Sequence, residues 1–351
     1  MTQATPASGR GEEGSEPQPR RRHLRGIAFI CFGIALVLFM GELAWSFFFD
    51  GEPPAILPPA GEVLAGKAPF RFAVVGDNRG NMTVFEEILA QIREQKASFI
   101  VHTGDLVMRC SARQYEWLLH ELDEEGLKVP FCAVPGNHDI YQDAEDPRAR
   151  YLHYCRWFGP RQYWFAYGNA LFVAFDDSYE KGSAPEDIAW LDRTLARLRD
   201  QYEACFVFLH VPPRDPRPGG RQAMGTGGPE LVAVLKKHHV TAALAGHIHS
   251  YLEDNIEGIP IYITGGAGAD LAENPPSTFH YLICTVEPGG SFHIEKHDVG
   301  DRIDLDRMEY LARVKFPAPA ILVTAASLVG LGIVCLTVER LRRRRSSPPP
   351  T

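Results

Sequence analysis

The sequence lacks an excess of basic residues. Lysine and arginine together number 36, against 44 aspartates and glutamates, and the net charge is −8. A surface that binds nucleic acid normally carries a basic excess. No nucleic-acid partner is therefore expected.

The sequence also lacks a disulfide framework, because its seven cysteines fall mostly in apolar segments. Five of them lie in apolar terminal segments or strand-like runs, where buried thiols are common. These five are Cys31, Cys132, Cys205, Cys284 and Cys335. Only Cys110 and Cys155 are placed where they could pair with each other, and nothing further in the sequence supports that pairing.

Large apolar side chains are almost absent from the first 22 residues, which are rich in Gly, Pro, Glu, Gln, Ser and Arg. Such a segment cannot bury enough apolar surface to fold alone. Residues 1–25 are therefore expected to form a disordered tail, which ends in Arg20, Arg21, Arg22 and Arg25.

Long apolar runs, in contrast, are present near both ends. Residues 26–49 contain one charge, Glu42, and residues 317–338 contain none. A helix rises ~1.5 Å per residue, so each run is long enough to cross a bilayer core of ~30 Å. A cleaved signal peptide is the alternative for the first run, but its apolar core is longer than usual and no clean cleavage site follows. A buried core helix is the alternative for the second run.

Arginines flank both apolar runs on their outer sides, at 20–25 and at 340–345. Positively charged flanks stay in the cytoplasm. We therefore expect two transmembrane helices in the cytoplasmic membrane, with both termini cytoplasmic and the central domain extracytoplasmic. The remaining boundaries are a Pro- and Gly-rich linker (50–68), a folded domain (69–300), a juxtamembrane segment (301–316) and a basic cytoplasmic tail (339–351).

Strands and helices alternate through most of the central region. Apolar runs predict strands at 70–75, 99–102, 129–134, 163–167, 170–175, 205–209 and 240–245. Apolar residues at helical spacing predict helices at 83–95, 115–122, 149–158, 184–200 and 229–238. This alternation implies a parallel sheet. Four further apolar segments, 251–256, 259–264, 279–286 and 292–297, predict a β meander.

Polar side chains of the kind that bind metals follow five of these apolar runs. The segments are Gly76-Asp77-Asn78-Arg79, Gly104-Asp105, Gly136-Asn137-His138-Asp139, His210, and Gly246-His247-Ile248-His249. A single Gly-Asn-His-Asp is more often an ordinary turn, but five such strand ends would converge along one edge of a sheet. Residues 70–300 resemble the calcineurin-like metallophosphoesterase superfamily, whose signature blocks occur in this order.

The resemblance implies a four-layer α-β-β-α sandwich of two mixed sheets, here flanked by the two transmembrane helices. It also implies two divalent metal ions, and carboxylate, amide and imidazole ligands suit Mn, Fe or Zn. By the same resemblance, Asp105 would bridge both ions. The first ion would also bind Asp77 and His249, and the second ion would bind Asn137, His210 and His247.

By the resemblance, His138 would be the acid that protonates the leaving oxygen or would hold the phosphate, oriented by Asp139. Arg79 departs from the family pattern, because most relatives have a metal-binding histidine there and a guanidinium has no lone pair to donate. Extra water could complete the first metal shell, Asn78 or a distant group could replace the histidine, or Arg79 could bind the substrate phosphate. Purple acid phosphatases, a related branch, lack the histidine but have a tyrosine where this chain has Met108.

The motifs therefore predict a membrane-anchored phosphoric ester hydrolase, in which a dinuclear metal centre activates water. They do not distinguish phosphate monoesters, diesters and pyrophosphates as substrates. The alternative is a weak or inactive domain of the same fold, damaged at Arg79, that binds a phosphorylated ligand or partner.

Overall fold

The computed structural model describes residues 21–48, 55–300 and 318–345. The chain divides into two compact units: Met1–Asp50 with Phe316–Thr351, and Gly51–Lys315. The expected juxtamembrane segment, 301–316, and most of the expected N-terminal tail lie outside the described residues, as do residues 346–351.

The larger unit contains a seven-stranded sheet in the order β1-β5-β6-β7-β8-β10-β9. Its strands are β1 (Val63–Leu64), β5 (Tyr163–Tyr167), β6 (Ala170–Ala174), β7 (Ala204–Phe208), β8 (Ala242–Ala245), β9 (Tyr251–Ile256) and β10 (Ile259–Thr264). β6, β7, β8 and β10 run parallel to one another, while β5 and β9 pair in antiparallel fashion with β6 and β10. The sheet is therefore mixed.

A second sheet has five strands in the order β12-β11-β2-β3-β4. They are β2 (Phe70–Val75), β3 (Ile100–His102), β4 (Phe131–Ala133), β11 (Phe279–Val286) and β12 (Phe292–Val299). β2, β3 and β4 are parallel, and β11 joins β2 in antiparallel fashion. Polar turns follow the parallel strands of both sheets.

Aromatic side chains fill the space between the two sheets. Alternate residues of β2 point into this layer, so Phe72 stacks on Phe99 at 5.2 Å and meets Phe206 of the other sheet at 5.4 Å, centroid to centroid. Period-two alternation gives each strand one face toward this core. The apolar core thus fixes the spacing of the two sheets.

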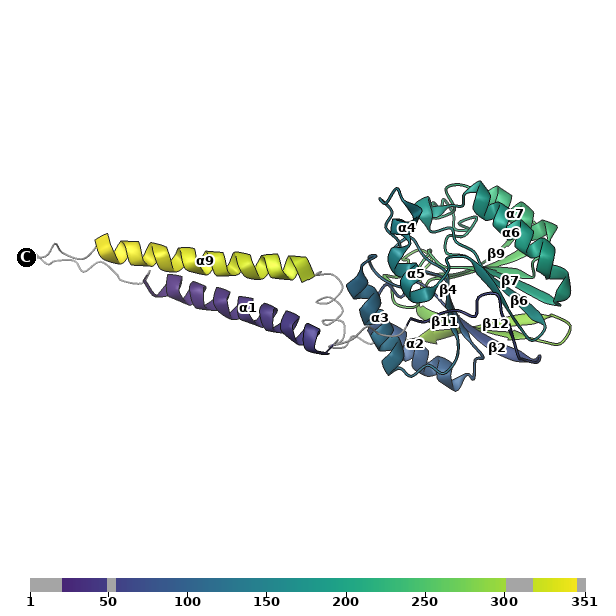
Figure 1. Ribbon diagram of the computed structural model, residues 1–351, viewed down its shortest axis with the longest axis horizontal. Helices are drawn as coiled ribbons and strands as arrows, with labels where there is room; N and C mark the ends of the chain where they lie inside the picture. Colours follow the sequence, from purple (N-terminus) through teal and green to yellow (C-terminus); the bar gives the residue numbers. More distant parts are fainter. Residues whose placement is uncertain (1–20, 49–54, 301–317, 346–351) are drawn as a thin grey trace, which may run out of the picture. The chain divides into compact units, whose positions relative to one another are not determined.

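Helices cover the outer faces of both sheets (Figure 1). α6 (Pro185–Leu198) and α7 (Gly228–Lys237) bury leucines, including Leu195 and Leu235, against the seven-stranded sheet. α2 (Met82–Glu94) packs on the other sheet, where Phe85 meets the His102 ring at 5.8 Å, and α3 (Ala112–Glu124) lies next to it. The predicted four-layer fold class is confirmed.

Three local predictions were wrong. We placed the start of the folded domain at residue 69, but β1 lies upstream and pairs in parallel with β5. The predicted meander is split between the sheets, because β10 pairs with β8 and β11 pairs with β2. The helix expected at 149–158 is two short helices, α4 (Pro147–Arg150) and α5 (Leu152–Phe158).

The smaller elements of this unit are two 3-10 turns, η1 (Tyr179–Lys181) and η2 (Arg199–Gln201). All seven cysteines are free, so Cys110 and Cys155 do not pair.

The other unit consists of α1 (Arg21–Phe48) and α9 (Ala318–Arg345). Both helices extend into the flanking arginines, which have high helix propensity; the expected basic tail is therefore helical as far as Arg345. Two segments are long and apolar enough to cross a membrane, Leu24–Gly41 and Val323–Leu341. Arg25 pairs with Glu339 at 2.9 Å, which makes the two helices antiparallel.

Candidate metal centre

The polar turns singled out in the sequence follow β2, β3, β4, β7 and β8. We expected these turns along one edge of a single sheet. They belong instead to both sheets, and the carboxyl ends of the two parallel sets meet. Backbone hydrogen bonds join the turns, from Asp77 N to Gly104 O (3.0 Å) and from Gly246 N to His210 O (2.9 Å).

Glycines allow the turns to approach one another. A Cβ on Gly104, whose φ is +93°, would lie 2.7 Å from Nδ1 of His210, and a Cβ on Gly136 would collide with the backbone of Asp105. Larger residues would therefore push the turns apart, which explains the glycines at these two positions.

The backbone is strained at the same place. Four residues with side chains adopt positive φ here: Asp77 (59°), Arg79 (46°), Asp105 (59°) and His247 (69°). Residues other than glycine avoid this conformation, and such strain concentrates at functional sites. The convergence of side chains thus has a local conformational cost.

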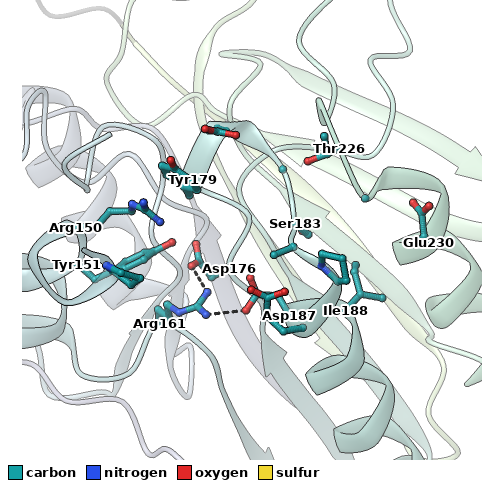
Figure 2. Close-up of a pocket in the computed structure, with 17 residues that line it drawn as sticks. Arg150, Tyr151, Arg161, Asp176, Tyr179, Ser183, Asp187, Ile188, Thr226 and Glu230 are labelled. Carbon is teal, nitrogen blue, oxygen red and sulfur yellow. Dashed lines mark hydrogen bonds and ion pairs between the residues drawn. The ribbon is translucent and has the colours of Figure 1, made fainter. Parts of the chain in front are cut away.

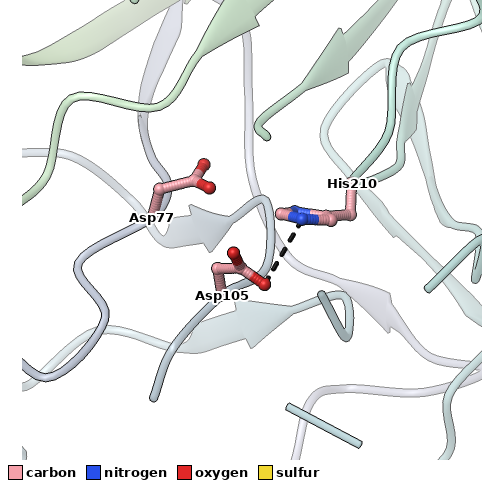
Figure 3. Close-up of side chains that lie close together, drawn as sticks. All are labelled: Asp77, Asp105 and His210. Carbon is pink, nitrogen blue, oxygen red and sulfur yellow. Dashed lines mark ion pairs between the residues drawn. The ribbon is translucent and has the colours of Figure 1, made fainter. Parts of the chain in front are cut away.

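Asp77, Asp105 and His210 form the centre of the cluster. One potential ligand atom from each lies within 4.8 Å of the other two, and all three side chains are buried (Figure 3). Nε2 of His210 lies 3.3 Å from Oδ1 of Asp105. Nδ1 of His210 faces the carbonyl oxygen of Thr103 at 2.8 Å, which leaves Nε2 directed at the cluster.

The other three predicted ligands surround this centre. Oδ1 of Asn137 and Nδ1 of His247 lie 3.2 Å and 3.3 Å from Nε2 of His210. Nε2 of His249 lies 3.4 Å from Oδ1 of Asp77. The structure therefore brings all six predicted ligands together.

Several buried ligand atoms have no hydrogen-bond partner in the described part of the chain. They are Nε2 of His247, and Oδ1 of Asp77 with Nε2 of His249, which face each other at 3.4 Å without the geometry of a hydrogen bond. An unpaired buried polar atom is costly, and a cation would satisfy atoms of this kind. The residues present thus fit divalent metal ions.

The charges in the site also favour metal binding. Burial would raise the pKa of Asp105, but His210, Arg79 and His138 hold this pKa below its ordinary value. The pKa of Asp77 is lowered as well, because His249 and His210 outweigh burial. Burial, with His210 beside it, lowers the pKa of His247 to about 3. These shifts keep Asp77 and Asp105 ionised and His247 neutral, which are the forms of these groups that bind metals.

Our expectation that Asp139 orients His138 was wrong. The carboxylate of Asp139 accepts hydrogen bonds from the backbone N–H groups of Gly136 (2.7 Å) and Val107 (3.1 Å). Nδ1 of His138 lies instead 2.7 Å from the carbonyl oxygen of Met108. Asp139 therefore links the turn of Gly136 to the turn of Val107. Burial beside Asp105 raises the pKa of Asp139 well above its ordinary value.

Arg79 lies in the site and pairs with Asp105. Its Nε and Nη2 donate to Oδ2 of that carboxylate at 3.0 Å and 2.9 Å. Asn78 does not replace the missing histidine, because its Oδ1 accepts from Nε2 of His102 (3.1 Å) and its side chain is turned toward Met82.

His102, which the sequence did not single out, supports two turns at once. Its Nδ1 accepts from the backbone N–H of Gly104 (3.2 Å), and its Nε2 donates to Asn78. Burial lowers its pKa to about 3, consistent with a neutral ring. The position of His102, a polar residue at the end of a strand, could have identified it. It lies just before the Gly-Asp motif, and only the motif itself was considered.

Asp177 was also missed in the sequence. Its two carboxylate oxygens accept from the backbone N–H groups of His210 and Val211, both at 2.9 Å. Burial raises the pKa of this carboxyl well above its ordinary value. Asp176-Asp177 follows an apolar strand, as the predicted ligands do, and that pattern could have identified it.

A pocket of about 640 Å³ is lined in part by Asp176, the residue before Asp177. Figure 2 shows Arg161 between Asp176 and Asp187, with both ion pairs at 2.7 Å. Arg150 lies 3.3 Å above the ring centre of Tyr179. Among the described residues, none of the six predicted ligands lines this pocket.

Known proteins resemble this chain across the region that contains the site. A probable cyclic nucleotide phosphodiesterase of Moraxella catarrhalis (strain BBH18) is 29% identical over 166 residues, which cover 42% of this chain and 56% of the relative. The probable glycerophosphodiester phosphodiesterase GpdQ of Arcobacter nitrofigilis is 27% identical over 174 residues, covering 44% and 57%. The chain thus spans little more than half the length of these curated relatives.

Among solved structures, the purple acid phosphatase PPD1 from yellow lupin (Lupinus luteus) seeds matches with a TM-score of 0.55. It is 17% identical, and the match covers 66% of this chain and 52% of the lupin chain. At this identity the likeness concerns the fold alone. The pattern of the family described as calcineurin-like phosphoesterase matches residues 70–251, more than half of the chain. The protein therefore belongs to the calcineurin-like phosphoesterase family.

Proposed function

We propose that the protein is a membrane-anchored, metal-dependent phosphoesterase whose preferred substrates are phosphodiesters. The observation that carries this proposal is the buried cluster of Asp77, Asp105 and His210, whose ligand atoms lie within 4.8 Å of one another. The names of the curated relatives, which are probable phosphodiesterases, support the choice of diesters.

Two half-sites would share Asp105. Asp77 and His249 would hold one ion, and Asn137, His210 and His247 would hold the other. The ions, when bound, would lower the pKa of water and neutralise phosphoryl oxygens. The mixture of carboxylate, amide and imidazole ligands suits Mn, Fe or Zn.

His138 would handle the proton of the leaving group. A carbonyl oxygen can only accept, so Nδ1 facing Met108 O at 2.7 Å carries a proton. Nε2 is then the nitrogen that can exchange a proton with a substrate oxygen. The backbone N–H of His138 donates to Oδ1 of Asp105 at 2.9 Å, which holds the ring at the edge of the metal ligands.

The two terminal helices would anchor the domain in a membrane. Outward-facing apolar side chains such as Phe29 and Val37 are 73% and 72% exposed, whereas the small side chains of Ala28 and Ala35 are buried. A core helix of a soluble protein would bury its large side chains, and lipid would cover them here. With the arginine flanks on the cytoplasmic side, both termini would be cytoplasmic and the domain would lie outside.

A second candidate function is a weak or inactive domain that binds a phosphorylated ligand. The specific observation in its favour is Arg79, which already neutralises Oδ2 of Asp105. The two candidates predict different responses to metal.

The test uses the full-length protein in detergent. Protein stripped with a chelator and then reloaded with Mn²⁺, Fe²⁺ or Zn²⁺ is assayed on bis(p-nitrophenyl) phosphate, p-nitrophenyl phosphate and a pyrophosphate. Restoration of diester hydrolysis by metal supports the phosphodiesterase. Phosphate binding without hydrolysis of any of the compounds would favour the ligand-binding module.

A further inference from the structure

Arg79 is attached to Asp105 in two independent ways. The backbone N–H of Arg79 donates to the carbonyl oxygen of Asp105 at 2.9 Å. The side chain returns to the same residue, where Nε and Nη2 both donate to Oδ2. The side chain of Arg79 is only 18% exposed, so its position is part of the turn and is not a surface contact.

The two carboxylate oxygens of Asp105 have different partners. Oδ1 accepts the backbone N–H of His138 at 2.9 Å and lies 3.3 Å from Nε2 of His210. Oδ2 accepts from Arg79. A carboxylate that bridges two cations needs a free lone pair for each, and the guanidinium already occupies one of its oxygens.

A guanidinium cannot complete a metal shell, because it has no lone pair and stays protonated. It can supply positive charge, and a hydrogen bond between a guanidinium and a buried carboxylate is one of the stronger polar contacts in proteins. Any ion that used Oδ2 would have to break this pair and accept a like charge beside it. Arg79 and an ion in the half-site of Asp77 and His249 therefore compete.

We propose that Arg79 is a built-in cation that takes the place of one of the two metal ions. The protein then holds one divalent ion tightly, on the side of Asn137, His210 and His247. A second ion binds only when Arg79 leaves Asp105. This inference rests on the proposed metal-dependent function and adds that the guanidinium provides the charge of the missing ion.

Metal stoichiometry tests the proposal without recourse to activity. Full-length wild type, Arg79→Ala, Arg79→Gln and Arg79→His are loaded with Mn²⁺, passed through gel filtration and analysed for bound metal. Titration calorimetry gives each dissociation constant. Arg214→Ala is the matched control, because Arg214 forms a forked pair with Asp254 on the surface.

Wild type and Arg214→Ala should retain one equivalent of Mn²⁺. Arg79→Ala and Arg79→Gln should bind a second ion about 10- to 100-fold more tightly than wild type, since the lost pair is a hydrogen bond to a charged group. Arg79→His should retain two equivalents and show the electron paramagnetic resonance signal of two coupled Mn²⁺ ions. Circular dichroism confirms that each variant is folded, and Arg79→Lys, which keeps the charge, should stay close to wild type.

A wild type that retains two equivalents as tightly as Arg79→Ala would overturn the inference and leave the proposed function intact. Equal stoichiometry in wild type and Arg79→His would overturn it as well. Absence of bound metal from every variant would remove both the inference and the metal-dependent function. Hydrolysis that a chelator does not reduce would contradict the function alone.

Discussion

Nδ1 of His138 lies 2.7 Å from the carbonyl oxygen of Met108. The backbone oxygen of a neighbouring turn, and not a carboxylate, thus fixes which nitrogen of this ring carries a proton. A carbonyl oxygen can only accept, so Nδ1 carries a proton and Nε2 is the ring nitrogen that can exchange a proton with a substrate oxygen.

Replacement of His138 tests its role as proton donor. His138→Ala should retain the metal content of wild type and hydrolyse poor substrates about 10²- to 10⁴-fold more slowly, the usual contribution of general acid catalysis. The loss should shrink for diesters with acidic leaving groups, which need less protonation. Measured kcat values for a series of aryl phosphodiesters check this.

His293→Ala is the control, since His293 is half exposed and should leave the rates unchanged. An equal loss for good and poor leaving groups would contradict proton donation and assign His138 to phosphate binding.

Asp177 should stabilise the turn that carries His210. In Asp177→Asn, an NH₂ group would face one of the two backbone N–H groups that the carboxylate now accepts from. We expect a loss of about 1–3 kcal/mol in the free energy of unfolding, together with weaker metal binding. Urea titrations of the metal-free protein measure the free energy of unfolding, and calorimetry measures the metal affinity.

The comparison variant for this test is Asp192→Asn, which alters a surface ion pair with Lys237. If Asp177→Asn had the same unfolding free energy and the same metal affinity as wild type, the position of His210 would not depend on Asp177.

His102 predicts a pH dependence of stability. Its pKa is about 3 in the folded protein, below its ordinary value of 6.5, so the unfolded chain binds one more proton between these values. Stability then falls as pH drops from about 6.5 to 3, by up to about 1.4 kcal/mol per pH unit from this residue. His102→Gln cannot titrate, and its unfolding free energy should fall less steeply with acidification.

Urea unfolding of metal-free wild type and His102→Gln at several pH values gives the difference directly. Parallel pH profiles would mean that His102 is not held neutral by the fold.

The membrane arrangement makes a separate prediction. An impermeant thiol reagent should label a cysteine introduced in the Pro53–Pro59 spacer of intact cells and miss cysteines at Ser8 or Ser347. Cys155 is exposed, so the experiment uses a Cys155→Ser background. Labelling in the reverse pattern would place the domain in the cytoplasm and contradict extracytoplasmic substrates.

The convergence of the six expected metal ligands could be predicted, because each lies within a few residues of the end of an apolar run, in blocks that resemble those of the family. Asp105 and His247, which follow glycines close to the ends of β3 and β8, illustrate this. The sequence could not assign the strands to two sheets, because pairing of β10 with β8 and of β11 with β2 depends on long-range contacts.

The contacts of individual side chains were less predictable. The family resemblance suggested that Asp139 would orient His138, but a residue 30 positions away supplies the partner. Arg79 was recognised as a departure from the family, while its pairing with Oδ2 of Asp105 depends on how two separate turns meet. β1 was missed because two residues in a Pro- and Gly-rich segment give no periodic signal.

Metal content and diester hydrolysis of Asp105→Asn, measured on the same full-length preparations, test the central claim most directly. Asp105 contacts both halves of the site, so the variant should lose bound Mn²⁺ and hydrolysis of bis(p-nitrophenyl) phosphate together. Asp254→Asn, in the surface pair with Arg214, should keep both. The account predicts a loss of orders of magnitude in kcat/KM for Asp105→Asn; wild-type hydrolysis at wild-type metal content in this variant would contradict it.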